Sequence, residues 1–368
     1  MRIIEAISDT NIGGAGILLL NRLACTDTEK YQTTVILPKG SMLMERVCAL
    51  GIKCVEIDCK GDASFDIHAM KEYRRVIKRI SPDIINCHGC LSARVAAKTC
   101  GVPVKICTRH CVYPISFREK IFAPFNNILS EHFIAVAHSA KQNLVDMGVD
   151  KSKISVIING ASPLRRIDDE EREALKNKLQ ISDNTTVLGF CARLERCKGH
   201  DWFIKATMEL SKRGVNFVAL LIGDGSQRQN LIELCEKSGV SERVIFCGFV
   251  KDVAPLMNIV DVNINCSVGT ETSSLALSEG MSLGVPAVVS DYGGNPYMIK
   301  HGVNGFVCPQ GDHLKMAEYI ETLIKDKKQY ENMSVQARKR FEDELNAEAM
   351  TAQTNRLYDK LYQAYHRA

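Results

Sequence analysis

Short, continuous runs of apolar residues alternate with longer segments of helical pattern along the first half of the chain. Such runs suit parallel β-strands that are buried on both faces, and helix-length segments such as 14–26 and 67–80 separate them. The expected strands cover residues 2–8, 33–38, 52–58, 83–87, 103–108, 133–137 and 153–158. This alternation predicts βαβ units that build a doubly wound α/β domain.

The pattern breaks between Ser162 and Thr186 and then starts again. The break is rich in charge and poor in large apolar residues, so we interpret 163–186 as a linker. After it, expected strands cover residues 186–191, 217–223, 243–249, 261–266, 286–291 and 305–308. The chain is therefore predicted to contain two Rossmann-like α/β domains, 1–162 and 187–350. Residues 351–368 have no strand to cover, and we expect them to form a helix that packs across the domain junction and crosses back to the first domain.

Two domains of this kind predict where the chemistry lies. Ligands of open α/β sheets sit beyond the carboxyl ends of the strands. Two such sheets that face each other place a site in the cleft between them. Each residue that carries chemistry is therefore expected just after a strand.

The composition is that of a globular protein. Of the 368 residues, 45% are hydrophobic and 24% charged, which excludes a disordered chain. The net charge of +4 is too small to indicate nucleic-acid binding. No apolar run approaches the roughly 20 residues of a membrane helix, and the start, "MRIIEAIS", is predicted to be a strand and has no signal-peptide pattern. We expect a cytoplasmic protein.

The cysteines need separate consideration because there are 15 of them. Two pairs, Cys87 with Cys90 and Cys107 with Cys111, have a spacing close to that of zinc sites. Each pair ends an apolar strand, however, whereas zinc ribbons are usually built on hairpins. We therefore expect reduced thiols that pack as small hydrophobic groups, with a metal site as the alternative.

A glycine-rich stretch, "NIGGAG", follows the first expected strand. Gly13, Gly14 and Gly16 allow the backbone to approach a ligand, and the helix that follows offers free N–H groups to an anion. The spacing is not that of the dinucleotide-binding fingerprint. A tight strand-to-helix turn is the other interpretation.

Two cations follow the first strand of the second half, in "CARLERCKGHD". Arg193 can bind phosphate oxygens with its planar fork, and Lys198 supplies a point charge beside Gly199. Two cations at one strand end suit a diphosphate. Solvated surface charges are the alternative.

A pair of acidic residues, Glu271 and Glu279, lies eight positions apart after the strand 261–266. The next helix should begin near Ser273 or Ser274, both of which are favourable N-caps. The amides of Ser274 and Leu275 can then hold a phosphate, while the two carboxylates accept hydrogen bonds from hydroxyl groups on either side of it. Sugar hydroxyls on both sides of a diphosphate indicate a nucleotide sugar.

In combination, these motifs resemble family 4 of the retaining glycosyltransferases, which have the GT-B architecture of two Rossmann-like domains. The motifs are "GGAG" at 13–16, "ARL" and "KG" around Arg193 and Lys198, the two glutamates, and "GVPAVVSDYGGNP". The resemblance extends over nearly the whole chain.

The resemblance implies a role for each matching position. Arg193 and Lys198 would bind the donor diphosphate and stabilise it as it leaves. The sequence contains no D-x-D triplet, which agrees with a mechanism that uses no metal ion, and no cofactor is expected. Glu279 would hold the ribose, and Glu271 the transferred sugar near the amides of Ser274 and Leu275. His110 would lie beside the sugar at the reacting centre, so the expected catalytic residues are His110, Glu271, Arg193 and Lys198. The glycines at 13, 14 and 16 would contribute to donor binding, and Gly248 and Val250 would contact the base of the donor, which is expected to be UDP-linked.

The sequence departs from the family pattern at positions that bear on the sugar. The glutamate that usually follows "GGNP" is replaced by Tyr297, and "TSS" stands where a glycine-aromatic-glycine stretch is usual. The identity of the sugar is therefore left open.

Two segments are candidates for the acceptor side. Basic residues line one face of the expected helix 67–80: Lys71, Arg74, Arg75, Lys78 and Arg79. They suit contact with an anionic membrane, and a solvated face is the alternative. The segment 111–128, with Arg118 and Lys120 among aromatic residues, suits an acceptor loop or simply a helix that covers the sheet.

The function that we expect is transfer of a sugar from a nucleotide diphosphate to a cell-surface glycan, a glycolipid or another hydroxyl acceptor. An epimerase or phosphorylase of GT-B fold is one alternative, and a non-catalytic sugar-nucleotide-binding subunit is the other.

Overall fold

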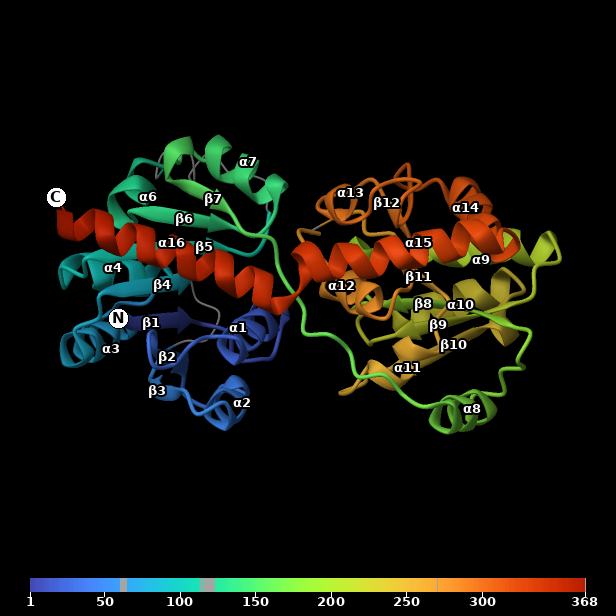
Figure 1. Cartoon of the computed structure of the whole chain (residues 1–368), viewed down its shortest axis with the longest axis horizontal. Coiled ribbons are helices and arrows are strands. Elements are labelled where there is room, and N and C mark those ends of the chain that lie inside the picture. The colour runs from blue at the N-terminus through green and yellow to red at the C-terminus, as the bar shows by residue number, and fades with distance from the viewer. Residues whose placement is uncertain (60–64, 113–114, 116–122, 270, 368) are drawn as a thin grey trace. The chain divides into compact units, whose positions relative to one another are not determined.

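A computed structural model describes residues 1–59, 65–112, 115, 123–269 and 271–367. The chain divides into two units: unit 1 comprises Met1–Ala161 and Ala347–Ala368, and unit 2 comprises Ser162–Asn346. Figure 1 labels the helices and most of the strands of both units.

The described residues of unit 1 form a seven-stranded parallel sheet in the order β3-β2-β1-β4-β5-β6-β7. Its strands are β1 (Arg2–Ile7), β2 (Gln32–Pro38), β3 (Lys53–Ile57), β4 (Ile84–His88), β5 (Val104–Arg109), β6 (His132–Ala135) and β7 (Ile154–Val156). Its helices are α1 (Gly14–Ala24), α2 (Leu43–Ala49), α3 (Ile67–Ile80), α4 (Leu91–Thr99), α6 (Ala123–Leu129), α7 (His138–Asp146), the short 3-10 turn η1 (Lys151–Lys153) and α16 (Ala347–Arg367).

The described residues of unit 2 form a six-stranded parallel sheet in the order β10-β9-β8-β11-β12-β13. Its strands are β8 (Thr186–Cys191), β9 (Phe217–Ile222), β10 (Val244–Gly248), β11 (Val262–Asn265), β12 (Ala287–Ser290) and β13 (Gly305–Cys308). Its α-helices are α8 (Asp169–Lys178), α9 (His200–Lys212), α10 (Arg228–Lys237), α11 (Ala254–Asn258), α12 (Leu275–Ser282), α13 (Asn295–Met298), α14 (His313–Lys325) and α15 (Lys327–Arg340). Two 3-10 turns, η2 (Arg196–Lys198) and η3 (Ser241–Arg243), and a π-helical segment, η4 (Phe341–Leu345), complete it.

The predicted fold class, two Rossmann-like parallel α/β sheets, is confirmed. The strands are buried along most of their length, as in β1 and β9, because helices pack on both faces of each sheet. Strand order reverses between β1 and β4 in unit 1 and between β8 and β11 in unit 2. The carboxyl ends at such a reversal form the usual ligand crevice of this architecture.

The segment predicted as a linker has a different place in the structure. Residues 163–186 belong to unit 2, and Leu164, Ile167 and Leu175 pack against the buried cluster that includes Met257. Asp168 caps α8 by accepting a hydrogen bond from the amide of Glu171 at 2.8 Å. The few apolar residues of this charged segment are therefore enough to attach it to the sheet.

The last helix, α16, belongs to unit 1 and begins at Ala347, four residues before the predicted boundary at 351. Its buried residues recur at helical spacing, from Ala347 and Met350 to Leu357 and Tyr358. Figure 1 shows α16, in red, lying across unit 1 beside α1 and β5, which it contacts.

Candidate functional site

The loop after β8 approaches the end of β11 because of one glycine. Gly199 has a positive φ of 72°, and a Cβ atom at this position would lie 2.2 Å from the carbonyl oxygen of Cys266. A larger residue would therefore force the two loops apart. Gly199 thus allows Lys198, at the end of η2, to reach the loop that carries Glu271.

Lys198 and Glu271 form a largely buried ion pair at this edge of the sheet. The Lys198 Nζ atom lies 2.8 Å from Glu271 Oε2. The same oxygen accepts hydrogen bonds from Ser267 Oγ at 2.9 Å and Asn265 Nδ2 at 3.2 Å. Three donors therefore hold the Glu271 carboxylate in one orientation, and the ion pair offsets the cost of burying its charge.

The backbone around Glu271 rests on a pair of glycines, Gly293 and Gly294. A Cβ atom on Gly293 would lie 2.0 Å from the carbonyl oxygen of Glu271, and one on Gly294 would lie 1.6 Å from that of Thr272. The "GG" of the "GGNP" motif therefore permits close packing under this loop. Its structural role is to place Glu271 at the strand end.

Helix α12 presents an open N-terminus next to Glu271. Ser274, one of the two serines that the sequence offered, is the N-cap, and its Oγ accepts a hydrogen bond from the amide of Leu277 at 3.3 Å. Among the described residues, no acceptor is recorded for the amides of Ser274 and Leu275. These two N–H groups, at the positive end of the helix dipole, are available to an anion.

Glu279 projects from α12 close to the end of β8. It is half-buried, and its carboxylate makes no hydrogen bond to any residue that the structure describes. Burial raises the pKa of Glu279 to about 7. Its charge contributes, after burial, to the raised pKa of the Cys191 thiol at the end of β8.

Arg193 differs from Lys198 because its side chain is exposed. It makes no ion pair or hydrogen bond through its guanidinium group in the described part of the chain. It lies two residues after β8, so the predicted pair of cations is present at one strand end.

Gly248 and Val250, the residues expected to contact the base, lie at the end of β10. Gly248 has a φ of 68°, and its carbonyl accepts a hydrogen bond from the Gly223 amide at 2.9 Å.

In unit 1, the predicted glycines lie at the start of α1 after β1. Gly13 is the N-cap, and a Cβ atom on Gly13 or Gly14 would meet no atom within 4 Å. Gly16 is buried instead, and its Cβ would lie 2.9 Å from a methyl group of Leu43. The structure therefore gives Gly16 a packing role between α1 and α2, and leaves space around the other two.

His110 follows β5 directly and contacts a buried polar cluster. Its Nε2 atom lies 2.7 Å from Nδ1 of His88, and His88 Nε2 lies 2.9 Å from Oε2 of Glu5. Burial lowers the pKa of His110 well below its ordinary value. His110 is therefore neutral at pH 7.

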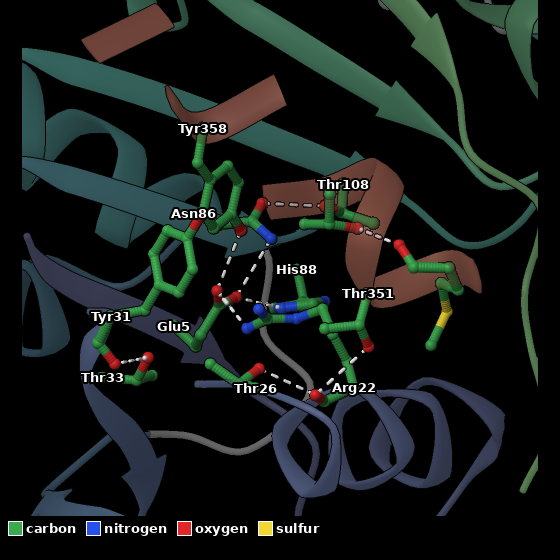
Figure 2. A network of polar contacts seen from close by, with 12 residues as sticks. Glu5, Arg22, Thr26, Tyr31, Thr33, Asn86, His88, Thr108, Thr351 and Tyr358 are labelled. Carbon is green, nitrogen blue, oxygen red and sulfur yellow. Dashed lines mark hydrogen bonds and ion pairs between the residues drawn. The ribbon is translucent and has the colours of Figure 1, made fainter. Parts of the chain in front are cut away.

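Glu5 is the centre of this cluster and is completely buried in β1 (Figure 2). Its Oε1 atom pairs with Arg22 of α1 and accepts a hydrogen bond from the Tyr358 hydroxyl of α16 at 2.9 Å. Its Oε2 atom accepts hydrogen bonds from His88 and, at 3.0 Å, from Asn86 Nδ2. Burial alone would raise the pKa of Glu5, but the Arg22 cation and the hydrogen bonds lower it, so the carboxylate is ionised.

Comparison with known proteins agrees with this architecture. The family model described as "Glycosyl transferases group 1" matches residues 171–340, and that described as "Glycosyltransferase Family 4" matches residues 12–163. Both halves of the chain thus match glycosyltransferase family models, the first half that of family 4. The fold of the chain is that of the GT-B glycosyltransferases. The resemblance noted in the sequence is thereby confirmed, and the protein is a glycosyltransferase.

Relatives of this glycosyltransferase act on different molecules. N-acetyl-alpha-D-glucosaminyl L-malate synthase of Bacillus anthracis is 25% identical over 304 residues, which are 80% of this chain and 79% of the relative. The 2-deoxystreptamine glucosyltransferase of Streptomyces kanamyceticus is 25% identical over 280 residues, with 70% and 72% covered. Anabaena HepE, solved in complex with UDP, shares the fold with a TM-score of 0.86 at 20% identity, with 98% of this chain and 100% of that chain covered.

The sequence missed the buried cluster of this glycosyltransferase. Sequence analysis considered His110 but not Glu5, Arg22, His88 or Tyr358 as a group. A signal was present, because Glu5 interrupts the apolar strand "RIIEAI" and Arg22 interrupts the apolar helix "GILLLNRLA". A charge in such a position generally has a buried partner.

The remaining sequence interpretations have simple structural outcomes. Cys87, Cys90 and Cys107 are buried thiols, and burial raises the pKa of Cys87 and Cys90, which favours the protonated form. Within the described ranges, no group of three or more His, Cys, Asp or Glu side chains is arranged to hold a metal ion.

The basic face of α3, which the sequence offered as a membrane contact or a solvated face, is largely exposed, while Tyr73 and Ile77 face the core.

Part of the acceptor segment, including Arg118 and Lys120, lies outside the described residues. Among the helices that the structure describes, none has the length and apolar character to span a membrane.

Proposed function

We propose that this glycosyltransferase moves a sugar, with retention of anomeric configuration, from a UDP-linked donor to a hydroxyl group of a glycan or lipid-linked acceptor. The observation that carries the proposal is the juxtaposition of Lys198, Glu271 and the open N-terminus of α12 at the reversal of strand order in unit 2. The structures of HepE in complex with UDP and with UDP-glucose support a UDP-linked sugar as the donor.

In this proposal, unit 2 binds the donor through groups of complementary charge. Arg193, Lys198 and the amides of Ser274 and Leu275 hold the diphosphate, and Glu279 accepts hydrogen bonds from the ribose hydroxyls. Lys198 exchanges part of its contact with Glu271 for the diphosphate. Glu271 then has an oxygen available to a hydroxyl group of the transferred sugar.

Stabilisation of the leaving group supplies most of the catalysis. As the bond between the sugar and the diphosphate breaks, negative charge grows on the phosphate and positive charge on the sugar ring. Arg193 and Lys198 stabilise the charge that grows on the phosphate, and stabilisation of this kind is the largest single term in many enzymes. His110, at the end of β5, acts beside the sugar. The cations perform the task that a metal ion performs elsewhere, so no metal or other cofactor is proposed.

The acceptor and location are also proposals. The exposed basic residues of α3, including Lys71, Arg75 and Lys78, suit contact with an anionic membrane surface that carries a lipid-linked acceptor. A protein that acts there is cytoplasmic and associates peripherally with the inner face of the membrane. This assignment is consistent with a role in cell-surface polysaccharide assembly.

Release of UDP from a panel of UDP-sugars, with and without candidate acceptors, tests the proposal. UDP release that rises on addition of an acceptor, and that continues in EDTA, is expected. Sugar interconversion without an acceptor would instead indicate an epimerase, and phosphate-dependent cleavage a phosphorylase. A thermal shift with UDP-sugars but no turnover would indicate a binding subunit. Transfer that EDTA abolishes would contradict the metal-independent mechanism.

The raised pKa of Glu279 predicts a pH dependence of donor binding. The carboxylate must be ionised to accept the ribose hydroxyls, so the bound nucleotide lowers the pKa from about 7 and releases a proton. The affinity for UDP is therefore nearly constant above pH 8 and falls by about tenfold between pH 8 and pH 6. Isothermal titration calorimetry across this range measures the effect.

The control for this prediction is Glu279→Gln, which has no proton to release. The phosphate of UDP itself takes up a proton near pH 6, and the variant shows that contribution alone. An equal pH dependence in the wild type and in Glu279→Gln would contradict the assignment of Glu279 to the ribose.

A further inference from the structure

His88 lies between the side chains of His110 and Glu5 in unit 1, and each of its two ring nitrogens contacts one of them. The His88 and His110 rings are inclined by 16° with centroids 5.0 Å apart, and the bridging nitrogens are 2.7 Å apart. These values suit a hydrogen bond in the common plane of the rings. On its other side, His88 meets Glu5 at 2.9 Å. Glu5, His88 and His110 thus form a continuous line from the core of the sheet to the end of β5.

The charges of the cluster determine where the protons lie. Glu5 is ionised, so it accepts, and His88 Nε2 carries a hydrogen. Arg22 already balances the charge of Glu5, and a second cation at His88 would leave a net positive charge in the core. A neutral His88 that donates to Glu5 from Nε2 accepts through Nδ1, so His110 donates from its own Nε2.

We propose that His88, oriented by Glu5, is a positioning residue that holds His110 in the tautomer with hydrogen on Nε2 and a lone pair on Nδ1. The proposal goes beyond the proposed function, since it names residues that act through His110, and its catalytic consequence rests on that function. In this tautomer, Nδ1 of His110 can accept a hydrogen bond and cannot donate one. The tautomer of a histidine is commonly set in this way by the partner of its other nitrogen.

Because the two oxygens of Glu5 have different partners, the positioning role of His88 can be tested separately from its contribution to fold stability. Tyr358 bonds to Oε1, together with Arg22, whereas His88 and Asn86 bond to Oε2. Tyr358→Phe therefore removes one hydrogen bond from the same buried carboxylate without touching the His88 contact. It is the matched control for any loss of fold stability in a His88 variant.

The experiment compares His88→Phe, His88→Gln and Tyr358→Phe in the full-length protein. The ring nitrogens of His110 are observed by NMR of histidine labelled with ¹⁵N, and a His110→Gln variant assigns them. We expect one tautomer, protonated at Nε2, in the wild type and in Tyr358→Phe, and a mixture in His88→Phe. A single unchanged tautomer in His88→Phe would overturn the proposal.

Steady-state kinetics supply the second measurement. His88→Phe is expected to lower kcat by about 10- to 100-fold, the scale for residues that orient functional histidines, with the donor KM within about threefold. Glutamine has both a donor for Glu5 and an acceptor for His110, so His88→Gln is expected to restore kcat to within about threefold of the wild type. A His88→Gln variant as slow as His88→Phe would overturn the positioning role, because it would indicate that a proton passes through His88.

The two measurements also separate this proposal from the proposed function. If the wild type transfers no sugar from any nucleotide donor, the proposed function fails, and the NMR comparison still decides whether His88 sets the tautomer of His110. If transfer occurs and kcat of His88→Phe equals that of the wild type, the positioning role fails and the glycosyltransferase assignment stands.

Discussion

Replacing Lys198 by alanine is expected to lower kcat by roughly 10²- to 10³-fold, the scale measured for the loss of one group that stabilises a developing anion. Lys198 is held beside Glu271 at 2.8 Å and needs little rearrangement to meet the diphosphate. The charge that it stabilises grows as the sugar leaves, so the loss should fall mainly on kcat and less on the donor KM. Initial rates of UDP release over a range of donor concentrations measure both constants.

The adjacent cation Arg196 provides the matched control for this substitution. It lies in the same 3-10 turn, η2, but its side chain is exposed and has no recorded partner in the described chain. Arg196→Ala should therefore leave kcat within about twofold, because an isolated surface charge contributes little. If Lys198→Ala retained kcat within threefold of the wild type while folded by circular dichroism, leaving-group stabilisation by this residue would be excluded.

Replacing Arg22 by methionine is expected to lower the free energy of unfolding of unit 1 by about 3–5 kcal/mol. The substitution leaves the completely buried Glu5 without the Arg22 cation, and the hydrogen bonds from Tyr358 and Asn86 come from neutral donors. Urea denaturation followed by far-UV circular dichroism measures the change. The single tryptophan, Trp202 in α9, reports on unit 2 by fluorescence and should show a smaller shift.

Two further variants separate the charge effect from lost packing. In Glu5→Gln/Arg22→Met no charge is left unpaired, so the double variant should be more stable than Arg22→Met alone. The exposed pair Lys30 and Asp359, 2.8 Å apart, gives the surface reference, and Lys30→Ala should leave the free energy of unfolding almost unchanged. A double variant less stable than Arg22→Met would show that the loss arises from packing.

Much of the fold could be predicted because its signals are local. Continuous apolar runs gave the strands of both sheets, and the start of α12 at Ser274 followed from the preference of serine for N-caps. Arg193, Glu271 and His110 all follow strands, as the rule for open sheets requires. What failed was the linker, since the charged surface of α8 concealed the few apolar residues that attach it to unit 2.

The sequence by itself determined the kinds of element, their order and which chemical groups follow each strand, because these depend on residues close together in the chain. Only the tertiary structure decided which strand ends are neighbours, and therefore that Lys198 meets Glu271 across 73 positions. It also decided that Glu5 is joined by His88 from 83 positions away and by Tyr358 from 353. The pKa of Glu279 near 7 and the ionised state of Glu5 have the same origin, since burial and partner charges exist only after distant segments have packed together.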